Sequence, residues 1–230
     1  MVESKFTLEE QMMARAISNA TKARPRCMPN PWVGAVLVSS DGQTFDGFTQ
    51  EFGSGHAETV CLNEAGRKAQ GATLYVTLEP CSHSGKTGPC VERIIESRIS
   101  RVVIGMKDPD RQVCGEGIKS LQNAGVDVVV GVLEDLVAEQ LAPYVHHRNT
   151  GRPYVILKIA TTLDGKVAAP DGSSQWITGP EARREGHKLR AYSDAICVGR
   201  GTVISDNPQL TVRDWSADDD IDKNLDPRRI

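Results

Sequence analysis

The sequence predicts an α/β protein: a mixed sheet with helices on both faces, followed by a second, smaller α/β unit. Short apolar runs alternate with amphipathic stretches through most of the chain, which is typical of a largely parallel sheet. The segment 149–153, Asn-Thr-Gly-Arg-Pro, interrupts this pattern before a new apolar run begins. No run of eighteen apolar residues exists in the 230-residue chain, so we expect no membrane span.

The chain opens with a helix and a hairpin. Thr7 followed by Glu10 forms a capping box, which predicts a helix to about Ala20. Strands are predicted at 32–38 and 44–50. The turn-forming stretch between them makes an antiparallel hairpin the simplest pairing.

Strands and helices then alternate. The remaining elements of the first part are a helix that begins at His56, strands at 72–78, 101–105 and 126–130, and helices at 90–97, 117–124 and about 133–145. We place the domain boundary at the interruption, which gives domains at 1–148 and 153–230.

The second domain is predicted to be short of strands. Strands are expected at 154–160 and 195–199, with a helix at 178–192 between them and an acidic, irregular stretch from Asp214. Two strands are few for an independent α/β domain, so we expect the chain to be incomplete at its C-terminus.

Composition narrows the class of partner. The net charge of −3 and an aromatic content of 5% argue against a nucleic-acid-binding surface. The N-terminus lacks a secretion signal, so we expect a cytoplasmic protein whose six cysteines stay reduced. The expected partner is a small-molecule substrate, and self-association into a homo-oligomer is left open.

One stretch carries metal chemistry. His56 and Glu58 form a His-Ala-Glu motif, and a Pro-Cys pair at Cys81 is followed, after a longer insert, by Cys90. One imidazole and two thiolates suit zinc and leave a fourth position for water, over which Glu58 can act as a proton shuttle. His56 and Cys81 are each expected to follow a turn and enter a helix, where the helix N-terminus favours thiolate.

Two alternatives remain at this point. His83 could complete a four-ligand structural zinc site, although Glu58 then has no role. The domain could also be a zinc-stabilised binding module without catalysis.

The motifs together resemble one family. Asn30 lies in Pro-Asn-Pro-Trp-Val-Gly-Ala, and residues 78–90 read Leu-Glu-Pro-Cys-Ser-His-Ser-Gly-Lys-Thr-Gly-Pro-Cys. With the stretches 157–166, 174–179, 198–203 and 206–213, this pattern resembles the bifunctional riboflavin-biosynthesis deaminase/reductase family in one register. The resemblance implies a cytidine-deaminase-like domain and the first part of a dihydrofolate-reductase-like domain. It implies zinc-dependent deamination of a phosphoribosylated diaminopyrimidinone, then NADPH-dependent reduction of its ribosyl group to ribityl.

The resemblance also assigns roles to residues. It makes His56, Cys81 and Cys90 the zinc ligands, Glu58 the catalytic proton donor, and Lys158 a candidate contact to the reacting ribosyl group. The first substrate would contact Asn30, His83, Lys86 and Asp108. The second would contact Ser174, Arg190, Leu210 and Arg213, and NADPH would contact Ala160, Trp176, Thr202 and Asp206.

The chain departs from the family pattern at three places. Thr49 stands where the family has His, Asp110-Arg111 stands where Asn-Pro is usual, and Gly88 replaces a common Pro. The family's reductase also continues past the position of Ile230 with a glycine-rich cofactor loop. We therefore expect this polypeptide to deaminate but to reduce poorly, with a deaminase carrying a non-functional reductase remnant as the alternative. A nucleoside or nucleic-acid deaminase is a weaker alternative, because those enzymes close the site with Cys-x-x-Cys.

Overall fold

The computed structural model describes residues 6–83, 88–111, 113–213 and 226–230. The chain divides into two compact units, Met1–Tyr154 and Val155–Ile230. Within the described ranges, none of the helices has the length and apolar character needed to cross a membrane.

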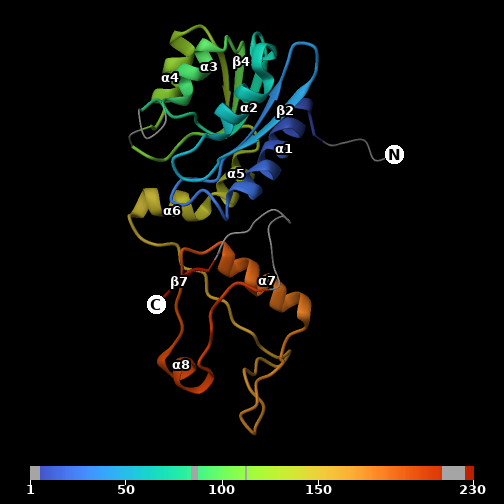
Figure 1. The fold of residues 1–230 in the computed structure, drawn as a ribbon, viewed down its shortest axis with the longest axis vertical. Coiled ribbons are helices and arrows are strands. Elements are labelled where there is room, and N and C mark those ends of the chain that lie inside the picture. The colour runs from blue at the N-terminus through green and yellow to red at the C-terminus, as the bar shows by residue number, and fades with distance from the viewer. Residues whose placement is uncertain (1–5, 84–87, 112, 214–225) are drawn as a thin grey trace, which may run out of the picture. The chain divides into compact units, whose positions relative to one another are not determined.

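The first unit is built on a five-stranded mixed sheet (Figure 1). The strands lie in the order β2-β1-β3-β4-β5. β1 is antiparallel to both β2 and β3, whereas β3, β4 and β5 are parallel. The strand bounds are β1 Gly34–Val38, β2 Thr44–Phe48, β3 Thr73–Leu78, β4 Arg101–Met106 and β5 Asp127–Val130. The predicted mixed sheet and its opening hairpin are confirmed.

Helices cover both faces of this sheet, as predicted. Successive strand residues point to opposite faces, so Val36 packs toward one helix layer and Leu37 toward the other. α1 (Leu8–Ala23) and α5 (Glu134–Gln140) cover the face of Val36, while α2 (Ala57–Ala65), α3 (Cys90–Glu96) and α4 (Glu116–Asn123) cover the face of Leu37. The short 3-10 helix η1 (Gly66–Ala69) follows α2.

The predicted capping box begins α1. The Thr7 hydroxyl accepts a hydrogen bond from the Glu10 backbone N–H at 3.3 Å, and the Glu10 carboxylate accepts one from the Thr7 N–H at 2.7 Å. Both contacts satisfy N–H groups that a helix start otherwise leaves without partners. α1 then packs its small residues, among them Ala16 and Ala20, against β1.

Gly34 permits the close approach of α1 to β1. A Cβ atom at Gly34 would lie 1.9 Å from the Ala16 carbonyl oxygen and 2.5 Å from the Ala20 nitrogen. Backbone atoms cannot move aside like a side chain, so Gly34→Ala should lower the free energy of unfolding by at least about 3 kcal/mol. Chemical denaturation followed by circular dichroism measures this. Gly201→Ala is the control, because its Cβ would meet nothing within 4 Å, and a loss equal to that of Gly34→Ala would contradict the packing argument.

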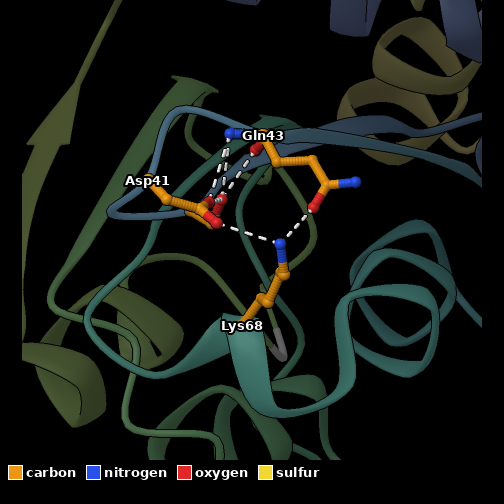
Figure 2. A network of polar contacts seen from close by, with 4 residues as sticks. Asp41, Gln43 and Lys68 are labelled. Carbon is orange, nitrogen blue, oxygen red and sulfur yellow. Dashed lines mark hydrogen bonds and ion pairs between the residues drawn. The ribbon is translucent and has the colours of Figure 1, made fainter.

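A polar network fastens the turn between β1 and β2 (Figure 2). Lys68 of η1 donates hydrogen bonds to the Asp41 carboxylate at 2.9 Å and to the Gln43 side-chain oxygen at 2.6 Å. Hydrogen bonds from Ser39 and then Lys68 lower the pKa of Asp41 to about 2. The network is solvent-exposed, so it orients the turn more than it stabilises the fold.

The predicted helix at 133–145 is wrong in one respect, because two helices occupy this stretch. α5 ends at Gln140, and α6 runs over Ala142–Thr150 with Pro143 in its first turn. Proline lacks an N–H and clashes with the preceding helical turn, so it is accepted at the start of a helix but not inside one. α6 also extends into the stretch expected to be irregular and ends at Gly151 in the left-handed conformation.

The second unit contains less regular structure than predicted. Its helix α7 covers Pro180–Ala191, which confirms the predicted helix, and its two short strands β6 (Ala195–Ile196) and β7 (Arg228–Arg229) pair in parallel. The expected strand at 154–160 is wrong, since these residues form no ladder with any described strand. The expected strand at 195–199 is limited to β6, and the helix α8 (Arg200–Asp206) was not predicted.

Candidate metal and substrate site

The topology brings several sequence segments to one edge of the sheet. β3 and β4 are parallel, so their carboxyl ends meet at this edge, and Cys81 and Asp108 follow those ends. β1 runs the other way, so Asn30, which precedes it, lies at the same edge. β2 ends opposite the start of β1 and leads through Thr49 to His56 at the beginning of α2. Sites of α/β proteins are commonly found at such an edge.

Three of the predicted residues come together there. The ligand atoms of His56, Cys81 and Cys90 all lie within 4.8 Å of one another. His56 Nδ1 is 3.6 Å from Cys81 Sγ and 3.3 Å from Cys90 Sγ. His83 is exposed and is not in this cluster of described residues, which weighs against the four-ligand structural site.

The spacing of these atoms fits tetrahedral zinc. With Zn–S about 2.3 Å and Zn–N about 2.0–2.1 Å, a tetrahedral site separates sulfur from nitrogen by about 3.5 Å. The two observed nitrogen–sulfur distances of 3.3 and 3.6 Å bracket that value. The mixture of one imidazole and two thiols is also the soft donor set that zinc prefers.

Helix starts present two of the three ligands. His56 is the N-cap residue of α2, as expected, and Cys90 is the first residue of α3. The expectation that Cys81 enters a helix is wrong, because residues 81–83 are irregular. Instead, the Cys90 N–H at the start of α3 approaches Cys81 Sγ at 3.4 Å, and the Val91 N–H donates to the Cys81 carbonyl at 3.2 Å. The N-terminus of α3, which follows the insert in the sequence, therefore still stabilises Cys81.

The two neighbouring thiols have opposite pKa shifts. Contact with Cys90, followed by contact with His56, lowers the pKa of Cys81 below that of a free thiol. The contact with Cys81 and burial raise the pKa of Cys90 well above that of a free thiol. A bound cation would release the remaining proton, because metal binding requires deprotonated thiolates.

Glu58 lies in the first turn of α2 and is only 4% exposed. Burial raises its pKa to about 7, with His56 opposing the shift and Cys81 adding to it. A carboxyl group with a pKa near neutrality can both take up and release a proton under physiological conditions. The structure thus supplies a physical basis for the acid/base role that the sequence suggested.

The predicted substrate contacts are distributed around this edge. Asp108 is 6% exposed and accepts hydrogen bonds from the Asp110 N–H at 2.8 Å and from the Tyr144 hydroxyl at 3.0 Å. Asn30 is half-buried in the turn before β1. Lys86 lies outside the described residues, so its placement stays a sequence-based prediction.

Thr49, one of the residues at which the chain departs from the expected motif, has a structural role in this chain. Thr49 is 2% exposed, its hydroxyl accepts a hydrogen bond from the Val33 N–H at 3.1 Å, and its N–H donates to the Val33 carbonyl at 2.9 Å. It therefore joins the end of β2 to the start of β1 and holds the two loops of the site together.

Sequence reasoning missed Glu79, which organises the same edge. Its buried carboxylate accepts four backbone N–H hydrogen bonds, from Asp108 at 3.2 Å, Gly115 at 2.9 Å, Gly117 at 3.0 Å and Ile118 at 3.2 Å. Glu79 thereby ties the loop that follows β4 and the start of α4 to the segment that carries Cys81. The feature of the sequence that could have identified Glu79 is its position as an acidic residue between an apolar strand and a Pro-Cys pair.

Replacing Glu79 by Gln should lower the free energy of unfolding by about 3 kcal/mol, because an amide NH2 would face backbone donors in a buried place. Urea denaturation measures the change. Glu116→Gln is the matched control, since that side chain is exposed and its ion pair, among the described residues, is with Lys119 on the same helix. Equal stability of the two variants would show that Glu79 does not organise these loops.

In the second unit, the two predicted substrate arginines lie near each other. Arg190 Nη1 on α7 lies 3.3 Å from His187 Nδ1, and the backbone N–H of Arg213 donates to the same nitrogen at 2.9 Å. Burial, and then the charge of Arg213, lowers the pKa of Arg190. Arg190 Nη1 donates to the Thr211 carbonyl at 3.2 Å and Arg213 Nη1 donates to the Thr211 hydroxyl at 2.7 Å, so both guanidinium groups contact one residue, an arrangement that suits a doubly charged phosphate. The Lys158 side chain lies beside α7, near Gly186.

The other predicted residues of this unit lie on separate segments. Trp176 is 71% exposed beneath the guanidinium of Arg183, which is 4.4 Å from the ring centroid. Thr202 and Asp206 lie one turn apart on α8. Ser174, Ala160 and Leu210 occupy irregular segments, and Leu210 has a positive φ of 56°.

Comparison with known families divides the chain in the same order. Residues 7–106 match the cytidine and deoxycytidylate deaminase zinc-binding region. Residues 153–230 match the RibD C-terminal domain.

Individual relatives match across nearly the whole chain. The riboflavin biosynthesis protein RibD of Escherichia coli is 44% identical over 96% of this chain and 60% of its own length. The protein of the same name from Aquifex aeolicus is 46% identical over 90% of this chain and 58% of its own. This chain therefore spans about 60% of the length of the curated relatives it matches.

Solved structures agree. Acinetobacter baumannii RibD, form 1, is 42% identical with a TM-score of 0.88, covering 96% of this chain and 62% of that one. A diaminohydroxyphosphoribosylaminopyrimidine deaminase/5-amino-6-(5-phosphoribosylamino)uracil reductase from Thermotoga maritima is 44% identical with a TM-score of 0.86 over the same shares.

Proposed function

The chain belongs to the RibD family of riboflavin biosynthesis proteins, and on that premise we propose that its first unit is a zinc-dependent pyrimidine deaminase. The single observation that carries this proposal is the cluster of His56, Cys81 and Cys90 beside the buried Glu58. The substrate we propose is a phosphoribosylated diaminopyrimidinone, the chemical class that the Thermotoga maritima deaminase/reductase is named for.

The chain's own residues would divide the chemistry among them. His56, Cys81 and Cys90 would hold zinc, which when bound supplies Lewis-acid activation of water. Glu58, whose pKa of about 7 results from burial, would accept a proton from the attacking water and deliver it to the departing amine. In the overall reaction, water would add at the amino-bearing carbon, the carbon–nitrogen bond would break, and ammonia would leave.

The remaining residues of the edge would bind and orient the substrate. Asp108 would accept a hydrogen bond from a ring or amino N–H, and the Asn30 amide would read the pyrimidinone edge. His83 and Lys86 belong to the insert between the two cysteines and would meet the phosphate. Binding through a phosphate favours this substrate over a free nucleoside.

For the second unit we propose part of an NADPH-dependent reductase that acts on the deaminated product. Arg190 and Arg213 beside His187 would bind its phosphate. Ser174 and Leu210 would contact the substrate, and Ala160, Trp176, Thr202 and Asp206 would contact NADPH. A domain arrangement of deaminase at 1–148 and reductase part at 153–230 belongs to the same proposal, as does a cytoplasmic location.

The test supplies the purified chain with the phosphoribosylated diaminopyrimidinone and measures ammonia release, then adds NADPH and follows nicotinamide absorbance. Ammonia release without comparable turnover of cytidine or single-stranded DNA supports the deaminase. Turnover of cytidine at an equal rate would favour the nucleoside deaminase instead. Absence of nicotinamide oxidation alongside ammonia release would support a deaminase with a non-functional reductase remnant.

A further inference from the structure

The loop after β4 carries two neighbouring carboxylates, Asp108 and Asp110. Asp110 stands in the segment next to Asp108, at the edge of the sheet that holds the metal cluster. Two carboxylates this close repel each other and would also repel an anionic substrate. A chain with Asp110 therefore needs something to offset the additional negative charge.

α6 supplies that offset. The Arg148 guanidinium forms an ion pair with Asp110, with Nε 3.2 Å from Oδ2, and the Asp110 side chain is only 22% exposed. Arg148 and Tyr144 are four residues apart, so both point from one face of α6 toward this loop. The guanidinium also lies over the Tyr144 ring, 5.1 Å from its centroid, which helps to fix both side chains.

Tyr144 completes the arrangement by fixing the Asp108 carboxylate. Its hydroxyl lies 3.0 Å from Oδ1 and 3.2 Å from Oδ2 of Asp108, while the Asp110 N–H donates to Oδ1 at 2.8 Å. Among the described residues, Oδ1 therefore has two donors, and Oδ2 has only the longer contact to Tyr144. Oδ2 keeps acceptor capacity for a ligand. Burial raises the pKa of Asp108. The hydrogen bonds from the Asp110 N–H and the Tyr144 hydroxyl oppose this shift, because they favour the charged form of the carboxylate.

We propose that Tyr144 and Arg148 are positioning residues of the deaminase substrate site. Tyr144 orients Asp108, and Arg148 neutralises Asp110 so that the site accepts an anionic, phosphorylated substrate beside two carboxylates. This inference rests on the proposed deaminase function. It makes α6, which neither the family motifs nor the metal cluster includes, part of the substrate site.

The test is a cycle of four proteins: the wild-type chain, Asp110→Asn, Arg148→Met and the double variant. Arg148→Met should raise KM for the phosphoribosylated diaminopyrimidinone about tenfold with kcat little changed. The substitution removes the positive charge that neutralises Asp110, and this charge affects the bound substrate and the transition state equally. Asp110→Asn removes the charge that needs the offset, so the double variant should return to a KM within about twofold of Asp110→Asn alone.

Arg101→Met is the matched control. Arg101 has nearly the same exposure as Arg148, 36% against 38%, and also pairs with carboxylates, but it begins β4 at the opposite edge of the sheet. It should leave KM unchanged, as should Tyr75→Phe, whereas Tyr144→Phe should raise KM. Zinc content and melting temperature are measured for every variant, so that a folding defect is recognised.

The outcomes separate this inference from the function on which it rests. If the wild-type chain releases ammonia but Arg148→Met matches Arg101→Met, or Asp110→Asn fails to restore KM, only the role of α6 is refuted. If the wild-type chain releases no ammonia, the deaminase proposal fails and this inference with it. Should Arg148→Met not fold, the double variant is compared with Asp110→Asn, and a KM difference of about tenfold between those two would refute neutralisation as the role of Arg148.

Discussion

Replacing Glu58 by Gln should lower the deamination rate constant by about a thousandfold while the protein keeps its zinc. Glu58 is 4% exposed, and Gln has nearly the same shape, so the substitution removes the proton-transferring group without opening a cavity. The three candidate ligands, His56, Cys81 and Cys90, are untouched. Ammonia release under saturating substrate and metal analysis of the same preparation measure the two quantities.

Glu64→Gln is the control for this prediction, because Glu64 lies on the same helix and is exposed. Burial raises the pKa of Glu58 to about 7, so holding its charged form in the folded protein carries a cost at alkaline pH that Gln lacks. Glu58→Gln should therefore be at least as stable as the wild-type chain at pH 8. A variant that retains zinc and most of its turnover would mean that another group transfers the proton.

The first part of the fold was predictable because its signals are local. Thr7 and Glu10 mark the start of α1 within a few residues of each other, and the turn before Thr44 favours a hairpin. His56 at the start of α2 could likewise be inferred from the glycine-rich turn before it. In each case the residues that form the contact are neighbours in the sequence.

The predictions of secondary structure were wrong where an element depends on residues far away in the sequence or on a single helix-breaking residue. Residues 154–160 are apolar enough for a strand, but a strand forms only when a neighbour completes its hydrogen-bond ladder, and none of the described strands does so. Pro143 divides the helix predicted at 133–145, because its missing N–H is tolerated only in a first helical turn.

The same distinction applies to the candidate site, where residues of short motifs could be predicted and contacts between distant residues could not. His56, Glu58, Cys81 and Cys90 belong to short motifs whose chemistry can be recognised in the sequence. The hydrogen bonds of Glu79 to the start of α4 and the ion pair between Asp110 and Arg148 join residues far apart in the chain. No periodicity or spacing indicates such contacts, since they follow from how α4 and α6 pack at the edge of the sheet.

Replacing Cys81 by Ala should reduce bound zinc from one ion per chain to nearly none. Cys81 Sγ lies 3.6 Å from His56 Nδ1, and the substitution leaves His56 and Cys90 as the two protein ligands of this cluster of described residues. Loss of a partner that merely orients a ligand costs about 10–100-fold in metal affinity, so loss of a ligand should cost more. Metal analysis after dialysis against a weak chelator measures the stoichiometry, and deamination should disappear with the metal.

Two further substitutions make this result specific. Cys114→Ala removes an exposed cysteine outside the cluster and should leave zinc unchanged. His83→Ala should also retain zinc, because the exposed His83 is not among the clustered ligand atoms of the described residues. Stoichiometric zinc in Cys81→Ala would show that the metal lies elsewhere, and loss of zinc in His83→Ala would restore the four-ligand structural site. A three-ligand site is the arrangement that leaves room for a reacting water, so the pattern across these variants decides whether the metal can take part in catalysis.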